Sequence, residues 1–185
     1  MMRIPFLLFC FVFSVRLCAD PIPSGKDTEP SVNEAEALLL SQAAERAKAN
    51  PAEAARMLRA GQTAETSAAI EFAEAVYWLD AGQTAEGFDA LHRTLAKHPR
   101  FHRARLNLAK LHMREGDYPA AARELQALLG SDTPDRAEAW RLLAYSLRET
   151  GQLAAAETAY RQAIVFFPED RALRLALLGC LIEQE

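Results

Sequence analysis

The chain has 185 residues, half of which are hydrophobic, and it carries 21 Lys and Arg against 25 Asp and Glu. A chain of this length and composition can bury one hydrophobic core, so a single compact unit is the default expectation. Charges of both signs are interspersed, and this mildly acidic balance offers no basic surface to nucleic acid. We therefore expect no nucleic-acid partner.

The first 19 residues have the pattern of a secretory signal peptide. A basic start at Arg3 precedes an apolar run over residues 4–15, and a small residue, Ala19, offers a cleavage site. As a helix this run would reach about 18 Å, which is short of the roughly 30 Å hydrocarbon core of a membrane. We therefore predict export across the inner membrane to the periplasm, with residues 1–19 removed.

Two alternatives remain open at the N-terminus. Residues 15–18 are similar to a bacterial lipobox, which would place a lipid on Cys18, although Arg16 and Leu17 depart from that pattern. The apolar run could instead stay in place as an uncleaved membrane anchor. Residues 20–32 follow, with three prolines and little to bury, and they predict an extended, flexible tether.

From Ser31 onward the chain carries the start and stop signals of helices and no alternation typical of strands. Ser31 and Glu34 predict a capping box for a first helix that ends near Ala49. Further helices are predicted over residues 51–61, 64–81, 85–97, 100–115, 119–129, 135–150, 153–166 and 169–184. Once residues 1–19 are removed, Cys180 is the single cysteine, so helix packing must hold the fold without an internal disulfide.

Small residues recur along these helices at one fixed spacing. Gly82, Gly116 and Gly151 lie 34 and then 35 positions apart. Two further sets keep the same steps, namely Ala75, Ala109 and Ala144, and Gly87, Ala121 and Ala156. A period of this length, with small residues where two helices must touch, predicts a stacked array of helix-turn-helix units.

Three successive segments resemble tetratricopeptide repeats, namely residues 68–101, 102–136 and 137–170. The last of them matches the repeat at Trp140, Leu143, Ala144, Leu147, Gly151, Ala156, Tyr160, Ala163 and Pro168. Residues 33–67 look like a degenerate repeat in front, and residues 171–185 look like a C-terminal capping or partial-repeat helix. The resemblance implies an all-α fold, a right-handed superhelical stack of antiparallel helix pairs. One departure is Glu74, which stands where the repeat usually has a large apolar residue.

In tetratricopeptide arrays the first helix of each pair lines a concave groove, and the resemblance implies which residues face it here. Carried onto this sequence, the groove residues are Phe72, Val76, Arg103, Leu106, Asn107, Lys110, Met113, Arg114, Arg141, Tyr145 and Arg148. Such a groove is apolar at one end and basic in the middle, so it suits an extended or helical peptide of a partner protein that carries apolar and acidic residues.

Two observations bear on this groove. Phe72 and Val76 occupy the places where related arrays use Lys and Asn to clamp an acidic C-terminus, so we do not expect that kind of ligand. The basic residues can also be ordinary solvated helix residues, because Glu138 and Glu149 are close enough in sequence to pair with several of them. Both interpretations of the basic residues stay open at this point.

The last predicted helix is apolar around nearly its whole circumference. A helix of this kind is usually buried, so we expect a second copy, another partner or further residues to cover it. The residues predicted for self-association, and hence for a homodimer through this helix, are Leu175, Leu178 and Ile182. The alternative is a terminal cap that leaves apolar side chains exposed to water.

The sequence contains no constellation that points to catalysis, a metal or a cofactor. His98 and His102 are four residues apart, but Pro99 breaks the helix that would align them and no carboxylate joins them. We therefore predict an exported, non-enzymatic scaffold or adaptor that binds a peptide or helix of a partner protein without a cofactor. The alternative is the N-terminal repeat region of a longer exported envelope enzyme or assembly factor.

Overall fold

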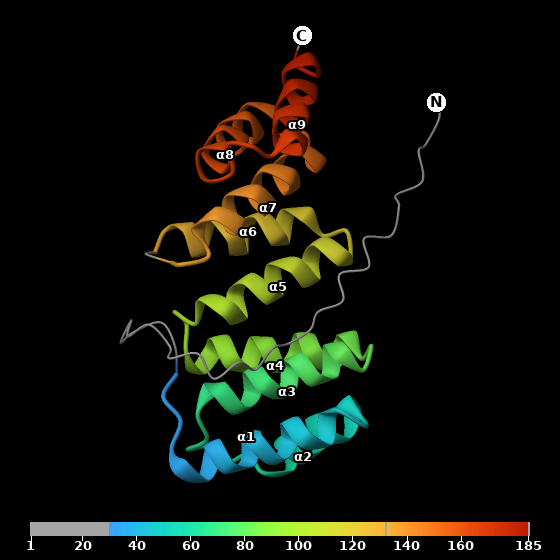
Figure 1. Cartoon of the computed structure of the whole chain (residues 1–185), viewed down its shortest axis with the longest axis vertical. Helices are drawn as coiled ribbons and strands as arrows, with labels where there is room; N and C mark the ends of the chain where they lie inside the picture. Colours follow the sequence, from blue (N-terminus) through green and yellow to red (C-terminus); the bar gives the residue numbers. More distant parts are fainter. Residues whose placement is uncertain (1–29, 132, 185) are drawn as a thin grey trace.

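The computed structural model describes residues 30–131 and 133–184, and within them every regular element is an α-helix (Figure 1). The elements are α1 (Glu34–Ala47), α2 (Pro51–Ala60), α3 (Ala68–Asp80), α4 (Thr84–Lys97), α5 (His102–Arg114), α6 (Tyr118–Leu129), α7 (Arg136–Glu149), α8 (Leu153–Phe166) and α9 (Arg171–Ile182). The predicted signal peptide, Cys18 and the tether up to residue 29 lie outside the described residues. Among the helices of residues 30–131 and 133–184, none combines the length and the hydropathy of a membrane span.

The helices form antiparallel pairs that stack along one axis. Each helix packs mainly against its neighbours in the chain, and α9 follows the fourth pair (Figure 1). Helices α1 to α4 lie across the long axis of the molecule, whereas α9 is steeply inclined to them, so the orientation turns along the stack. This arrangement confirms the predicted all-α superhelical stack.

Glycines in a left-handed conformation end the first helices of three pairs. Gly82, Gly116 and Gly151 have φ angles of 75°, 80° and 74°, and no other described residue has a positive φ. An L-residue is strained at such angles, whereas glycine is not. The recurring glycine therefore lets each of these first helices stop and the chain turn back at the same point of every repeat.

The recurring small residues lie where the two helices of a pair meet. Ala75, Ala109 and Ala144 are completely buried. In the first of these pairs, a Cβ atom added to Gly87 of α4 would lie 2.4 Å from Cδ2 of Leu79 in α3. This close approach confirms that small side chains set the spacing within a pair.

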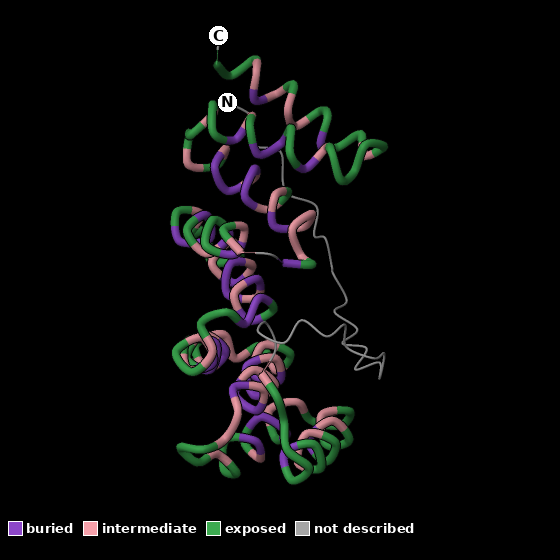
Figure 2. The backbone as a smooth tube through the Cα atoms, turned by 90° about the vertical axis from the view of Figure 1, so that its left-hand side faces the viewer, coloured by how far each residue is buried: buried purple, intermediate pink, exposed green. Residues whose placement is uncertain are grey.

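The predicted single core is replaced by three clusters of buried apolar residues. One joins α1 to α3, one joins α3 to α5, and the largest joins α5 to α9. Figure 2 shows the buried residues distributed along the whole length of the stack. The expectation of one core was wrong because a helix pair in a stack contacts only the pairs beside it.

The first helix begins two residues later than predicted. Its capping box is formed by Asn33 and Glu36, in place of Ser31 and Glu34. The backbone N–H of Glu36 donates to Oδ1 of Asn33 at 2.9 Å, and the N–H of Asn33 donates to Oε2 of Glu36 at 3.0 Å. Glu36 also accepts a hydrogen bond from the N–H of Ser67 at 2.6 Å, and this distant contact favours the later start.

The third helix begins at Ala68, four residues after the predicted Ala64. A local turn delays it, because the N–H of Thr63 donates to Oγ1 of Thr66 at 2.8 Å and the N–H of Glu65 donates to Oγ1 of Thr63 at 3.3 Å. Threonine hydroxyls that bond to nearby backbone in this way compete with helix formation.

Candidate functional site

Side-chain contacts connect the first helices of successive pairs to one another. Phe72 of α3 contacts Phe101 at the start of α5, with 4.8 Å between the ring centroids. Lys110 of α5 forms an ion pair with Glu138 of α7. Further along, α7 is joined to α9 by Arg148 and Glu183. The residues predicted to bind a partner therefore follow one row of first helices along the stack.

The N-terminal end of this row is aromatic and carries one cation. The guanidinium carbon of Arg103 lies 5.6 Å from the centroid of the Phe72 ring and 5.7 Å from that of Phe101. A guanidinium at this distance from an aromatic face is attracted by the quadrupole of the neutral ring, whose face is partially negative. Val76 lies one turn further along α3 and is half-buried. This end thus offers apolar surface with a positioned positive charge beside it.

In the middle of the row, two cations share one carboxylate. Nζ of Lys110 lies 3.0 Å from Oε1 of Glu138, and Nη2 of Arg141 lies 3.7 Å from the same oxygen. Both pairs are partly exposed, so each contributes little to stability. Glu149, the other acid that could have paired here, forms no ion pair within the described residues.

The remaining predicted residues of α5 differ in how much surface they offer. Leu106 is only 5% exposed and belongs to the cluster that packs against α7, so it presents almost no surface to a ligand. Asn107 and Met113 are half-buried. Arg114 is exposed, and its Nη2 donates to Oγ1 of Thr84 at 2.7 Å.

The C-terminal end of the row contains the predicted aromatic anchor. Tyr145 packs edge-on against Tyr118, with 5.8 Å between the ring centroids. Burial, together with a hydrogen bond to Tyr118, raises the pKa of the Tyr145 hydroxyl well above its ordinary value, so this group stays neutral. Arg148 is half-buried, and its Nη2 lies 2.7 Å from Oε1 of Glu183.

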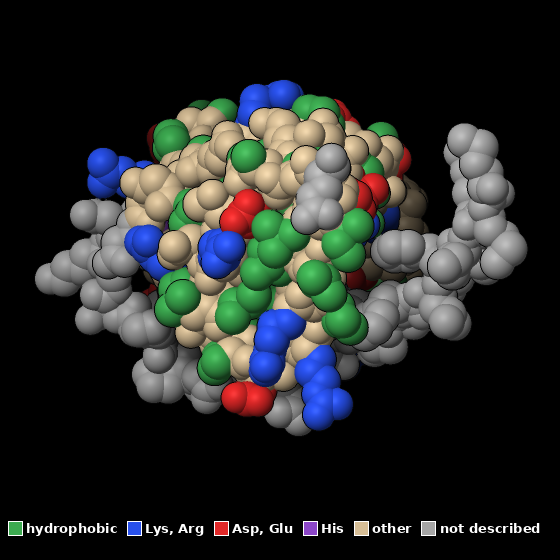
Figure 3. Space-filling view, turned by 90° about the horizontal axis from the view of Figure 1, so that it is seen from above, with side chains coloured by type: hydrophobic (Ala, Val, Ile, Leu, Met, Phe, Trp, Pro, Cys, Tyr) green, Lys and Arg blue, Asp and Glu red, His purple; other side chains and the backbone are tan. Residues whose placement is uncertain are grey.

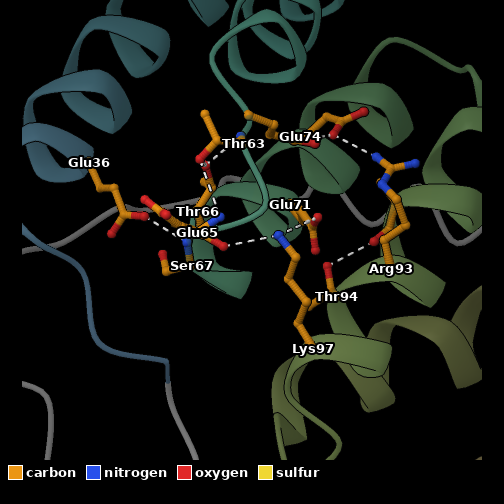
Figure 4. A network of polar contacts seen from close by, with 12 residues as sticks. Glu36, Thr63, Glu65, Thr66, Ser67, Glu71, Glu74, Arg93, Thr94 and Lys97 are labelled. Atoms are coloured by element: carbon orange, nitrogen blue, oxygen red, sulfur yellow. Dashed lines mark hydrogen bonds and ion pairs between the residues drawn. The ribbon is translucent and has the colours of Figure 1, made fainter.

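Sequence reasoning did not find the buried ionic network around Glu74. This carboxylate is completely buried, and it accepts hydrogen bonds from Nε1 of Trp78 at 2.9 Å and from Nε2 of Gln62 at 2.6 Å. It also accepts one from Nη2 of Arg93 at 2.7 Å (Figure 4). A buried carboxylate needs partners of this kind. The glutamate at an apolar repeat position, paired with an arginine 19 residues later, was the available signal.

Two more carboxylates extend this network toward the first helix pair. Glu71 is almost completely buried and lies 3.0 Å from Nζ of Lys97 (Figure 4). Burial alone would raise the pKa of Glu36, but hydrogen bonds from the backbone N–H groups of Ser67 and Asn33 outweigh it, and the pKa lies below its ordinary value. Charged side chains thus connect α1, α3 and α4.

The residues predicted for self-association are exposed, as that prediction requires. Leu175, Leu178 and Ile182 on α9 are 67%, 52% and 63% exposed. Figure 3, which looks onto the C-terminal end, shows hydrophobic side chains gathered in a band with Lys and Arg side chains at one end of it. The rest of the row carries no comparable group of exposed leucines.

Comparisons with known proteins extend these observations. Among solved structures, MamA AMB-1 superposes with a TM-score of 0.70 at 16% identity, over 81% of this chain and 82% of that chain. MamA from Desulfovibrio magneticus RS-1, from residue 41 to its end, gives 0.71 at 17% identity, over 83% and 88%. The first TPR of Spaghetti bound to HSP90 peptide SRMEEVD gives 0.54 at 13% identity, over 62% and 92%. At these identities the likeness concerns the fold alone.

The family assignment comes from sequence. No curated protein matches the chain. A family model described as tetratricopeptide repeat matches residues 72–124 and 106–171, which together span more than half of the 185 residues. The glycines that end the first helices and the buried alanines between the paired helices fall within these matches. The chain belongs to the tetratricopeptide repeat family.

Proposed function

We propose that the protein is a non-enzymatic scaffold whose row of first helices binds a peptide or helix of a partner protein. The observation that carries this proposal is the continuous set of contacts from Phe72 through Lys110 to Arg148, which presents aromatic and basic groups along one face. Such a face suits an extended or helical segment that carries both apolar and acidic residues. The Spaghetti structure supports peptide binding as the function, because there a repeat domain of similar fold is bound to a peptide.

Two cations are the best placed to recognise acidic residues of such a partner. Arg103 is exposed and held over two aromatic rings, and Arg141 is exposed and only loosely paired with Glu138 at 3.7 Å. Arg148 is less available than Arg141, because Glu183 pairs with it at 2.7 Å. We therefore assign the specificity for acidic groups to Arg103 and Arg141, with Tyr145 as a neutral aromatic neighbour.

The test uses two charge reversals on this face, with one charge reversal elsewhere as a control. Wild type, the Arg103→Glu/Arg141→Glu variant and the Arg161→Glu variant are crosslinked to partners in the envelope fraction. Arg161 lies on the second helix α8 and is also exposed, so its reversal changes the net charge without touching the proposed face.

We expect the double variant to lose its crosslinked partner and the control to keep it. Binding of the identified partner, measured by titration calorimetry at low salt, should weaken about tenfold or more for the double variant. Equal capture and equal affinity for all three proteins would refute the proposed face.

We also propose that the chain is exported and acts in the periplasm. The support is the basic start, short apolar run and small residue at Ala19 in the sequence. Fusion to alkaline phosphatase tests export, and the mass of the mature N-terminus tests its processing. A chain that starts at Asp20 supports cleavage, a lipid-bearing Cys18 supports the lipoprotein alternative, and an intact Met1 supports an anchor or no export.

A second candidate function follows from the exposed apolar residues of α9. They fit the N-terminal repeat region of a longer exported enzyme or assembly factor, whose following segment would cover Leu175 and Ile182. Coding DNA that continues in frame beyond Glu185 would support this candidate, and a stop codon at that point would remove it.

A further inference from the structure

Two residues from neighbouring helices hold the guanidinium of Arg148 on α7. One is Tyr160 of α8, whose side chain is buried and whose hydroxyl forms a hydrogen bond with Arg148. The other is Glu183 at the end of α9, whose Oε1 lies 2.7 Å from Nη2 of Arg148 and whose side chain is 45% exposed. Arg148 is thus fixed from the buried side and covered at the surface by a carboxylate of the chain itself.

Apart from this ion pair, Glu183 is weakly held. It follows the last residue of α9, and the last turn of this helix carries no basic side chain. The C-terminal end of a helix dipole is negative, so a carboxylate is disfavoured at this position. Among residues 30–131 and 133–184, Arg148 is its single ion-pair partner. A partly exposed pair of this kind contributes little to stability, so little free energy is lost when Glu183 leaves Arg148.

The pair also has the chemistry that the proposed face offers to a partner. Arg148 lies in the same row of first helices as Arg103 and Arg141, and the group that occupies it is a carboxylate. When Glu183 leaves, the contact with Tyr160 remains, so the guanidinium stays positioned for an incoming carboxylate. Preorganisation of this kind reduces the entropy that is lost on binding.

We propose that Glu183 is an internal competitor of the partner, which occupies Arg148 until an acidic side chain of the bound segment replaces it. The inference rests on the proposed binding face and adds a means of regulating it. Because the partner must displace Glu183 at this end of the row, an acidic residue placed there gains less affinity than one placed at Arg103 or Arg141. Full affinity therefore requires that the end of α9 release Arg148.

Glu183→Gln tests the competition, with Glu149→Gln as its matched control. Glu149 is exposed at the end of α7, and its charge acts on Tyr145 and Tyr160 beside the same site. In the part of the chain that the structure describes it forms no ion pair with Arg148. Both substitutions remove one negative charge from this end of the row, and only Glu183→Gln frees Arg148. The probe is a synthetic peptide of alternating leucine and glutamate with both ends blocked, and fluorescence anisotropy at low salt measures its affinity for the protein.

We expect Glu183→Gln to bind the probe about threefold to fivefold more tightly than wild type, because a partly exposed ion pair contributes about that much. Glu149→Gln should change the affinity less than about twofold. The gain should disappear in an Arg148→Gln background, where Glu183 has no cation to occupy. Equal affinities of wild type and Glu183→Gln, or a gain that persists without Arg148, would overturn the inference.

The Arg103→Glu/Arg141→Glu variant separates this inference from the proposed function. If that variant loses the probe while Glu183→Gln binds it like wild type, the binding face stands and the internal competitor is wrong. If the probe binds none of the proteins at millimolar concentration, both are wrong.

A second measurement needs no ligand. Arginine-specific modification with phenylglyoxal, followed by mass spectrometry, measures the access of a reagent to Arg148. Arg148 should react several-fold faster in Glu183→Gln than in wild type, whereas Arg141 in the same helix should react at the same rate in both. An unchanged rate at Arg148 would overturn the inference even if the affinity for the probe changes.

Discussion

Replacing the buried glutamate of α3 should cost far more stability than an exposed glutamate with the same ion-pair distance. Glu74→Ala removes the acceptor for Trp78, Gln62 and Arg93 at once. Hydrogen bonds to a charged group contribute about 1.5–3 kcal/mol each, so the three together amount to roughly 5–9 kcal/mol before any compensation.

Two effects reduce this sum. Removing the carboxylate also removes the cost of burying it, and Arg93 is 31% exposed, so its guanidinium regains water. We therefore expect Glu74→Ala to lower the free energy of unfolding by about 3 kcal/mol. Glu45 is the control, because its carboxylate also lies 2.7 Å from a cation, Lys48, but both side chains are 70% exposed. Glu45→Ala should cost less than about 0.5 kcal/mol.

Urea unfolding measures the free energy of unfolding of both variants. The signal is the fluorescence of Trp78, the residue that contacts Glu74, in a Trp140→Phe background. Glu74→Leu adds a second comparison, because Leu108 and Leu143 occupy the same repeat position in the next two repeats. Both substitutions leave the indole N–H of Trp78 without its acceptor, but leucine fills the volume that alanine leaves empty. The loss of unfolding free energy should therefore be smaller for Glu74→Leu than for Glu74→Ala. Equal costs for Glu74→Ala and Glu45→Ala would refute the reasoning about burial.

Two further predictions concern helix contact and pH. Gly87→Ala places a Cβ atom against the side chain of Leu79, which Leu79→Ala shortens. The effect of Gly87→Ala on the free energy of unfolding should therefore be more favourable, by about 1 kcal/mol or more, in a Leu79→Ala background than in wild type. A double-mutant cycle by urea unfolding checks this coupling, and additive effects would contradict it. The lowered pKa of Glu36 means that its contribution to stability is present above its ordinary value of 4.5 and is lost as pH falls through the folded-state value. Glu36→Gln should therefore reduce the loss of thermal stability between neutral and acid pH, and an unchanged acid limb would contradict this assignment.

The fold could be predicted because the repeat leaves its spacing in the sequence. In three of the four helix pairs the turn has a glycine with a positive φ and a buried alanine lies in the first helix, so Gly116 and Ala109 mark two events that recur in the repeats before and after them. Helix starts were less accurate, because they depend on distant partners. Glu36 caps α1 while it also accepts the N–H of Ser67, and nothing local in the sequence distinguishes it from Glu34.

The candidate site was harder to predict, because neighbouring helices decide which side chains remain available. Repeat position alone placed Leu106 in the groove, yet that side chain is buried between helices. The repeat positions also gave Arg148 and Arg141 the same role in the groove. In the structure Arg148 forms a close ion pair with Glu183, which follows the last helix, whereas Arg141 is only loosely paired with Glu138. These pairings join residues far apart in the chain, so a reading of single helices cannot supply them.

The three separate apolar clusters have a mechanical consequence. Because α1 to α3 and α5 to α9 belong to different clusters, one end of the rod can melt while the other keeps its shape. Under a pulling force the molecule would then lengthen in stages, and an assembly held together by it could stretch and recoil without losing all of its structure.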